Sequence, residues 1–373
     1  MKLTVRSRDL VRELGVAQGI VEAKTTIPVL GNVLLTAKGD SLQLECTDLE
    51  LSIRTSCQAA VDEAGSTLIP IRRLFEYARL LPDADLTVTA DGGEPVDIEC
   101  GRAKTRIAAM PDRGVFPEMA EVPQAAASIP ARVLAQGIQR AIVSVAESTV
   151  QYAITAAQFI VRRDAVGFVS TDGHRLTLHI EKREVEGIDD EMVGLMTRKA
   201  MSELAKILSD SEGSPENVEF STDENNLFFR YGKRLLVARK VAGKFPDYKR
   251  VLPKDLEIAL VLEKDSLAAL LRRVKQFASE KGRMVRLDLE TGNLKFSASS
   301  FQYGASEESL AVDYEGEPFG VGFNADYIID FLQVCGGDEV LLRLKDPRSA
   351  AQFELPSTDD DKDYRYVIMP VRV

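Results

Sequence analysis

Cysteine and histidine are scarce in this sequence, which has four cysteines and two histidines among 373 residues. The cysteines stand far apart, no two of them form a CxxC pair, and neither histidine completes a metal-ligand spacing. This scarcity argues against a zinc site, which normally shows closely spaced ligand pairs. We therefore expect no metal and four reduced, buried thiols, at Cys46, Cys57, Cys100 and Cys335.

Long apolar runs are also missing. No stretch approaches the roughly 20 apolar residues that span a bilayer. The first residues, Met1–Arg6, lack the apolar core of a signal peptide. We expect a cytosolic protein without a membrane partner, in which Met1–Arg6 forms an edge strand.

An excess of basic residues is absent as well. The chain has 47 Lys and Arg against 58 Asp and Glu, which gives a net charge of −11. Simple nucleic-acid binders usually carry a basic excess. A sum over the whole chain does not, however, exclude one basic face.

The sequence has no P-loop, no GxGxxG after a strand and no GxSxG. Asp172-Gly173-His174 is the one stretch that suggests acid–base chemistry. The pair Thr47-Asp48 repeats the Thr-Asp sequence without a histidine, which favours a turn stabilised by Asp172. We therefore expect no catalytic residue.

The sequence does contain a threefold repeat. Segments 69–81, 196–208 and 323–335 align without gaps, 127 residues apart both times. Strand-like segments 42–48, 166–172 and 293–299 recur at offsets of 124 and 127, and Gly-x-Phe-Pro recurs 129 residues apart, at 114–117 and 243–246. The repeats predict three homologous domains, 1–120, 128–250 and 251–373, with proline-containing linkers near 117–123 and 246–253.

Each repeat predicts two helices, because apolar residues recur at spacings of three and four. The predicted helices cover 7–23, 70–81, 130–146, 197–208, 264–279 and 324–335. The remainder alternates with period two and is broken by turns, which predicts about eight short strands per domain. The fold class is therefore α+β, with the helices on one face of antiparallel sheet.

With the third window extended to 130–147, the predicted helices hold five more basic than acidic residues, although the chain is acidic. These cations either sit on ordinary solvated faces or form one basic surface shared by the three domains. No motif for reading bases is present, so any contact would be with phosphates. The surface would consist of Arg72, Arg73, Arg79, Arg198, Lys199, Lys206, Arg272, Arg273 and Lys275.

The chain end is unusually apolar. Residues 366–373 are apolar apart from one arginine, whereas termini are usually polar and frayed. The segment predicts either a last strand or an apolar groove, and the flexible Met369 would suit binding of varied peptides. Both interpretations can hold together.

Four motifs together carry a family resemblance. They are Ile27–Asn32, Thr171–Leu176, Phe245–Pro253 and Tyr366–Val373. In this order, within a threefold repeat of this length, they resemble the bacterial DNA sliding clamp, the beta subunit of DNA polymerase III. The resemblance implies a clamp fold in which two chains close head to tail into a ring, with helices lining the hole.

The resemblance also implies a function. The protein would have no catalytic activity and no cofactor, would encircle double-stranded DNA of any sequence, and would work in the cytoplasm at the nucleoid. Its partners would be a second copy of the chain, the polymerase III catalytic subunit and a clamp loader. Other polymerases and repair proteins would bind through short linear peptides.

Sites follow from the resemblance residue by residue. The peptide pocket would lie between the second and third domains. It would comprise Ile154, Thr171, Gly173, His174, Arg175, Leu176, Pro246, Arg250, Val251, Asn324, Val367, Met369, Pro370, Val371 and Arg372. Lys24 and Tyr152 match positions near DNA, although Ala153 stands where many relatives carry a second aromatic residue. Thr105 and Ile107 would face the region of Phe277 in the second chain.

Two other hypotheses stay open at this point. A peptide-binding scaffold of the same fold could have lost its DNA role, in which case it would need neither a basic interior nor a closed ring. An enzyme centred on Asp172 and His174 ranks third.

Overall fold

The computed structural model describes residues 1–22, 24–91, 95–110, 116–124, 127–148, 152–188, 191–210, 215–279, 283–356 and 361–371. Its contacts divide the chain into two compact units. The first comprises Met1–Ala135, Glu186–Ile188 and Lys199–Lys240, and the second Gln136–Val185, Asp189–Arg198 and Val241–Val373. Within the described residues, no helix is both long and apolar enough to cross a membrane.

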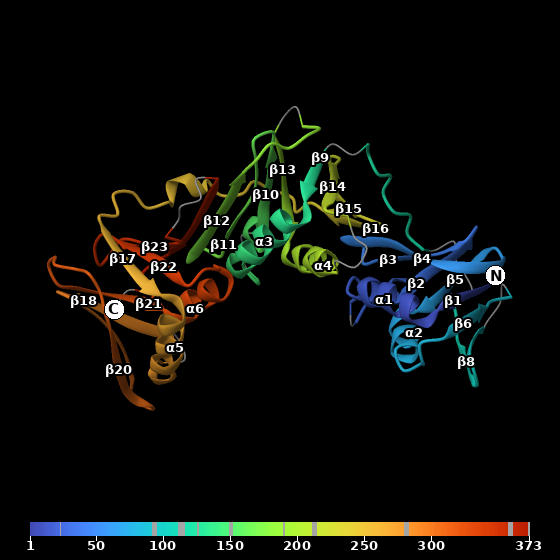
Figure 1. Ribbon diagram of the computed structural model, residues 1–373, viewed down its shortest axis with the longest axis horizontal. Coiled ribbons are helices and arrows are strands. Elements are labelled where there is room, and N and C mark those ends of the chain that lie inside the picture. Colours follow the sequence, from blue (N-terminus) through green and yellow to red (C-terminus); the bar gives the residue numbers. More distant parts are fainter. Residues whose placement is uncertain are drawn as a thin grey trace. The chain divides into compact units, whose positions relative to one another are not determined.

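Each repeat contains eight described strands and two α-helices in the same order (Figure 1). Repeat 1 runs β1 (Lys2–Arg6), α1 (Ser7–Gln18), β2 (Asn32–Lys38), β3 (Ser41–Thr47), β4 (Leu51–Glu63), β5 (Gly65–Pro70), α2 (Ile71–Ala78), β6 (Asp85–Thr89), β7 (Val96–Cys100) and β8 (Ala103–Ile107). Repeat 2 runs β9 (Ala127–Pro130), α3 (Ala131–Ala141), β10 (Ala156–Arg162), β11 (Ala165–Thr171), β12 (Arg175–Lys182), β13 (Met192–Thr197), α4 (Arg198–Ser209), β14 (Asn217–Thr222), β15 (Asn226–Tyr231) and β16 (Arg234–Arg239). Repeat 3 runs β17 (Ile258–Glu263), α5 (Lys264–Val274), β18 (Met284–Glu290), β19 (Asn293–Ser300), β20 (Gly304–Ala311), β21 (Phe319–Asn324), α6 (Ala325–Val334), β22 (Glu339–Leu344), β23 (Ala351–Glu354) and β24 (Lys362–Ile368).

The first unit contains a sheet of 12 strands, and the second contains sheets of eight and four strands. All the strand pairs described are antiparallel, as the α+β prediction requires. Figure 1 shows α1 and α2 side by side in the first unit and α5 and α6 side by side in the second. The apolar faces of α5 and α6 meet the inner faces of the neighbouring strands in one core, which includes Leu271, Phe296, Phe331 and Tyr366.

The first helix of each repeat ends earlier than its apolar spacing predicts. The α-helix α1 ends at Gln18, where Gly19 and Ile20 close tight turns onto preceding carbonyls. Helices α3 and α5 tighten into the short 3-10 turns η3 (Ile142–Ser144) and η6 (Lys275–Phe277). The extra apolar spacing therefore continues through turns and the residues after them, where Ile20, Val145 and Ala278 are buried. Tightening of the last turn is a common way to end a helix.

The first strand is not an edge strand, so this prediction is wrong. Strand β1 lies between β4 and β6 and pairs with both. Strand β4 is 13 residues long, and its far half reaches past β3 to pair with β1. The sequence of β1 itself carries no sign of the length of a distant neighbour.

The pairing registers also correct the sequence alignment of the repeats at one place, the strand-like segment of repeat 3. Met196 and Phe323 are equivalent in the sequence, and they pair with Ala157 and Val285. Two residues further along these partner strands, Phe159 pairs with Phe168, and Leu287 pairs with Phe296. The third strand set is therefore offset by 128 rather than 127 residues, which puts both buried phenylalanines on the same face.

The repeats are joined by strand pairing. The fourth strand of repeat 1, β4, pairs with β16, the eighth strand of repeat 2. In the same way β12 pairs with β24, the fourth strand of repeat 2 with the eighth of repeat 3. Two strands of these classes remain at sheet ends: among the described residues, β20 pairs only with β19 and β8 only with β7.

The four cysteines are buried free thiols, as expected for reduced residues. Burial raises the pKa of the Cys57 thiol to about 12, so it stays protonated at neutral pH. A search of the described ranges finds no cluster of three or more His, Cys, Asp or Glu that could hold a metal ion.

Candidate functional site

The Thr171–Arg175 segment forms the turn that the sequence suggests. The Oδ1 atom of Asp172 accepts hydrogen bonds from the backbone N–H groups of His174 at 2.9 Å and Arg175 at 3.0 Å. Gly173 has φ of +89°, a conformation that favours glycine. Since Asp172 also accepts from the Arg175 guanidinium at 2.9 Å, both carboxylate oxygens are engaged, and Asp172 serves the turn rather than acting as a base for His174.

The same turn recurs in repeat 1. Asp48 accepts from the backbone of Glu50 at 2.9 Å and Leu51 at 2.6 Å. In both turns the preceding threonine, Thr47 or Thr171, donates its hydroxyl to the carbonyl four residues on. The Thr-Asp pair is therefore a structural element of the repeat.

Arg175 anchors this turn to repeat 3. Its guanidinium donates to Asp330 at 2.7 Å and to the Tyr366 hydroxyl at 3.1 Å, and lies 4.2 Å above the centre of the Tyr327 ring. Burial alone would lower the pKa of Arg175, but Tyr366, Asp330 and Asp172 outweigh it and raise the pKa. Arg175 is therefore a fixed cation beneath the turn, while His174 next to it is exposed.

An apolar cluster lies beside the turn. Leu176 and Val367 are buried in it together with Phe245, and Tyr248 and Leu252 from the segment after repeat 2 pack against it. Ile154 is buried as well. Pro246 and Val251, which belong to the predicted pocket, are exposed. Arg250 is exposed too, and it pairs with Asp247 at 3.0 Å.

The chain end forms a wall between the turn and β21. The Met369 N–H donates to the His174 carbonyl at 2.8 Å, and the Val371 N–H donates to the Gly322 carbonyl at 2.8 Å. These two bonds hold Pro370 between repeats 2 and 3, while the Met369 side chain stays 38% exposed. The chain end is therefore a last strand, β24, followed by the exposed Met369, and its use as a groove for peptides stays a prediction.

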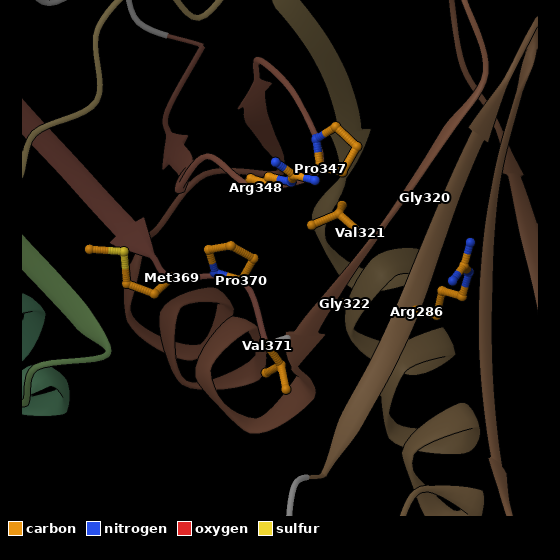
Figure 2. A pocket seen from close by; sticks show the side chains of 9 residues that line it. All are labelled: Arg286, Gly320, Val321, Gly322, Pro347, Arg348, Met369, Pro370 and Val371. Carbon is orange, nitrogen blue, oxygen red and sulfur yellow. The ribbon is translucent and has the colours of Figure 1, made fainter. Parts of the chain in front are cut away.

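Two cavities lie near the chain end and the turn. Figure 2 shows one of about 770 Å³, with Met369, Pro370 and Val371 on one side, Arg286 on the other, and Pro347 and Arg348 along the top. The other, of about 920 Å³, is polar and is lined by His174, Arg175, Asn324, Tyr327 and eleven further residues. Asn324 also caps α6, since its Oδ1 accepts from the Asp326 N–H at 2.9 Å.

The structure thus brings most of the predicted pocket residues to one region. Exposed at its surface are Gly173, His174, Pro246, Arg250, Val251 and Met369, and half-buried are Thr171, Arg175, Asn324, Pro370 and Val371. Ile154, Leu176 and Val367 lie beneath them. Arg372 lies outside the described residues.

The predicted DNA-facing residues divide into two groups. Lys24, Arg72, Arg73, Arg79, Lys206, Arg272 and Arg273 are exposed. Arg198, Lys199 and Lys275 are half-buried and make structural contacts. For Tyr152 the backbone lies in the turn η4 (Tyr152–Thr155), and its side chain is outside the described part.

Two of the half-buried cations, Arg198 and Lys199, donate to carbonyl groups just past the ends of neighbouring helices. Arg198 donates to the carbonyls of Ile142 at 3.0 Å and Val145 at 3.2 Å, where α3 ends. Lys199 donates to the Ile20 carbonyl at 2.8 Å, beyond the end of α1, and to Asp48. Lys275 pairs with Asp326 at 2.8 Å. A basic residue on a predicted helix is therefore not always available to a ligand.

The predicted interface residues lie on separate elements. Thr105 and Ile107 are half-buried on β8, which is at a sheet end. Phe277 lies in η6 and packs against the core of repeat 3.

Sequence reasoning missed Asp330 and Tyr366, which hold Arg175 in place. One signal was available for Asp330, because an acidic residue occupies this place in all three repeats, at Glu76, Glu203 and Asp330. Nothing in the sequence connected it with an arginine 155 residues away.

Comparisons with known proteins agree over the whole chain. The N-terminal, central and C-terminal domain models of the DNA polymerase III beta subunit match residues 1–119, 128–247 and 249–372. The chain belongs to the DNA polymerase III beta subunit family. The resemblance drawn from the sequence is thereby confirmed.

Individual relatives are called beta sliding clamps. The chain is 32% identical to that of Caulobacter vibrioides and 33% identical to that of Pseudomonas putida, each with 100% of both chains covered. Among solved structures, a sliding clamp from Pseudomonas aeruginosa matches with TM-score 0.91 and 30% identity, with full coverage of both chains. One from Bartonella birtlesii bound to griselimycin matches with TM-score 0.92 and 29% identity, also with full coverage.

The predicted fold class and function are confirmed at the level of the family. The chain is a DNA sliding clamp of α+β fold and acts in DNA replication as a non-catalytic processivity factor. The enzyme hypothesis is therefore wrong, in agreement with the engaged carboxylate of Asp172.

Proposed function

We propose that two copies of this chain close head to tail into a ring around double-stranded DNA. The ring would hold the polymerase III catalytic subunit, a clamp loader and repair proteins through short linear peptides. Residues 1–120, 128–250 and 251–373 are its three clamp domains on each chain. The ring would work in the cytoplasm, at the nucleoid.

The observation that carries the proposal is the pair of open sheet ends. Inside the chain, the fourth strand of one repeat twice pairs with the eighth strand of the next. Among the described residues, the members of these two classes without a partner strand from another repeat are β20 and β8. Pairing β20 with the β8 of a second copy repeats the same junction, and doing so twice closes two chains into a ring of six repeats.

The registers inside the chain predict the register between chains. Ile53 pairs with Leu236 at the first junction, and Thr177 with Tyr366 at the second. Counting along the equivalent ladders, Ser306 takes the place of Ile53 and Thr177. Thr105 likewise takes the place of Leu236 and Tyr366. Ser306 should therefore lie opposite Thr105 of the second chain.

Charge supports this register. One residue further along, Glu307 would lie opposite Lys104, with Arg106 as its diagonal neighbour. Opposite charges across an antiparallel pair are favourable, by about 0.2–1 kcal/mol. Glu307 and Lys104 are exposed in the single chain, where they pair with Lys295 at 3.7 Å and Glu99 at 2.8 Å, and each would exchange this partner for the other.

The proposal is tested by a cysteine pair. The native cysteines are all buried, so the double variant Thr105→Cys with Ser306→Cys adds the accessible thiols. Residues directly opposite in an antiparallel pair are about 4.5–5.5 Å apart at Cα, within disulfide reach. Oxidation should give a dimer of 41.0 kDa chains that is linked at both interfaces.

The matched control is Lys104→Cys with Ser306→Cys, which is one residue out of register and points to opposite faces. Closed rings loaded on circular DNA before oxidation should stay on it in detergent and leave after linearisation. A chain that is monomeric at all concentrations would overturn the proposal. A dimer that binds peptides but never stays on circles would favour the scaffold alternative.

The peptide site of this proposal is the region around the turn and the chain end. Its support is an exposed methionine and histidine next to two cavities and above an apolar cluster. Such a surface suits a short extended peptide with one or two large apolar side chains.

The DNA-facing surface of the proposal consists of the exposed cations. Arg72, Arg73 and Arg79 come from α2 and its end, and Arg272 from α5. Contacts of this kind with phosphates hold DNA without reading its sequence and still allow the protein to slide.

A further inference from the structure

Each junction between repeats inside the chain buries one arginine, which comes from the eighth strand, β16, at the first junction and from the helix α3 at the second. At the first junction Arg234, two residues before Leu236 on β16, donates to Glu13 at 3.0 and 2.9 Å beside Thr55. At the second junction Arg140 lies 3.4 Å from the His179 Nδ1 atom and 4.3 Å from the centre of the Tyr364 ring.

Repeat 3 carries the corresponding groups on its open side. Arg273 is the tenth residue of α5, as Arg140 is the tenth residue of α3. Glu308, two residues after Ser306, takes the place that His179 has two residues after Thr177. Arg273 donates to both Glu308 oxygens, at 2.8 and 2.5 Å, in a bidentate pair.

The exposure of Arg273 differs from that of the two arginines at the junctions inside the chain. Residue exposure is 3% for Arg234 and 4% for Arg140. At the third place the Arg273 side chain is 60% exposed and that of Glu308 is 30% exposed. The first two arginines are covered by the neighbouring repeat, whereas β20 has no described partner on this side.

We propose that Arg273 and Glu308 form part of the interface between chains, where the β8 strand of a second copy covers the pair. This inference rests on the head-to-tail pairing proposed above. It moves Arg273 from the DNA-facing surface to the chain interface.

The opposing side chain fits this role. The register places Ala103 of the second chain opposite Glu308. The second junction has Tyr364 at this place, and continuing the ladder of the first junction by one residue gives Arg234. A small residue leaves space for a carboxylate and a guanidinium that come from the same chain. The hydrogen bond from Arg273 already lowers the pKa of Glu308, so the carboxylate is charged when the second chain arrives.

Covering the pair makes assembly depend on both partners. In the single chain the two charges are solvated and contribute little. In the ring they lose water, and removal of one partner leaves a charge without compensation at the interface. Removing one charge should therefore weaken dimerisation more than exchanging the two charges does.

The test compares dimer dissociation constants of full-length variants by sedimentation. Glu308→Gln and Arg273→Gln should each raise the dissociation constant at least tenfold. The exchanged variant, Arg273→Glu with Glu308→Arg, should lie within threefold of the wild type. The matched control is Arg272→Gln, an exposed neighbour on α5, which should leave dimerisation unchanged.

A second readout separates the interface from DNA. In rings closed by the Thr105→Cys and Ser306→Cys disulfides, Arg273→Gln should not change sliding or retention on DNA, whereas Arg272→Gln should weaken the salt-dependent hold. Single changes that leave dimerisation within threefold, with unchanged thermal unfolding, would overturn this inference. A wild-type chain that never dimerises would instead overturn the proposed ring.

Discussion

At the scale of single residues, Glu13 carries its charge in a fully buried place. Its carboxylate accepts from Arg234 and from the Thr55 hydroxyl and lies 3.2 Å from Lys233. Burial would raise the pKa of Glu13, but Arg234, Thr55 and Lys233 outweigh it and lower the pKa. Arg234 also bonds Asp210 at 2.7 Å, which extends the network to the end of α4.

The network should make the stability of the fold depend on pH in the acidic range. Hydrogen bonds from Arg12, together with those from Arg234, lower the pKa of Asp210 from 3.8 to about 2. A carboxyl whose pKa is lower in the folded than in the unfolded protein stabilises the fold at pH values above its unfolded pKa. This stabilisation is lost as the pH falls through the folded pKa. We expect Asp210→Asn to lower the melting temperature at pH 7 and to flatten its fall between about pH 4 and 2. Asp9→Asn, an exposed change on α1, should leave both unchanged, and an unaltered profile in Asp210→Asn would contradict the assignment.

His174 and Met369 are the exposed side chains that a peptide would meet first. Because their backbones share a hydrogen bond, both side chains belong to one surface. We expect His174→Ala with Met369→Ala to weaken a fluorescent peptide at least tenfold, about 1.4 kcal/mol, in an anisotropy titration. The control is Arg250→Ala, which changes an exposed residue paired locally with Asp247. It should reduce the affinity for the peptide less than the double change does. Equal affinities for all three proteins would mean that the peptide binds elsewhere.

The turn at Asp172 could be predicted because its cause is local: an aspartate, a glycine and a repeated Thr-Asp pair. The role of Arg175 could not, because its partners Asp330 and Tyr366 are 155 and 191 residues away. Sequence spacing identifies which residues sit near the site. It does not show which of them are fixed and which are free to bind.

At the scale of elements, all six predicted helices exist, but their ends and their charges needed the structure. Apolar spacing continues through η3 and η6, and the 3-10 geometry depends on contacts such as Arg198 with the end of α3. Counting cations on helices likewise merged exposed residues with those that cap a neighbouring element. Only the exposed cations are available for the proposed basic surface.

This distinction gives a prediction for DNA binding. Changing Arg72, Arg73 and Arg272 to Glu should shorten retention on nicked circles without lowering the melting temperature, because these residues are exposed. Lys199→Glu should instead lower the melting temperature, since Lys199 bonds the Ile20 carbonyl and Asp48. Retention after loading and thermal unfolding measure the two effects. The division of the cations would be contradicted if the triple change lowered the melting temperature and Lys199→Glu shortened retention without affecting the melting temperature.

At the scale of the whole molecule, the threefold repeat predicted the number of helices and strands and the fold class. It did not predict that the repeats share sheets, because the edge strands of a repeat resemble its inner strands in sequence. Two described sheets therefore run across repeat boundaries, through β4 with β16 and β12 with β24. The compact units of the chain consequently divide repeat 2 between them.

The shared sheets determine the behaviour of a fragment cut at the repeat boundaries. Residues 128–250 alone would expose β12 and β16, which have lost their partners, and unpaired strand edges promote aggregation. We expect this fragment to be recovered as aggregates at concentrations where the full chain stays soluble, as judged by light scattering. A soluble monomeric fragment with a cooperative melt would show that a repeat folds independently of its neighbours. For this clamp, a segment would then stay soluble only if it keeps its sheets complete, and the boundaries of such a segment differ from those of the sequence repeat.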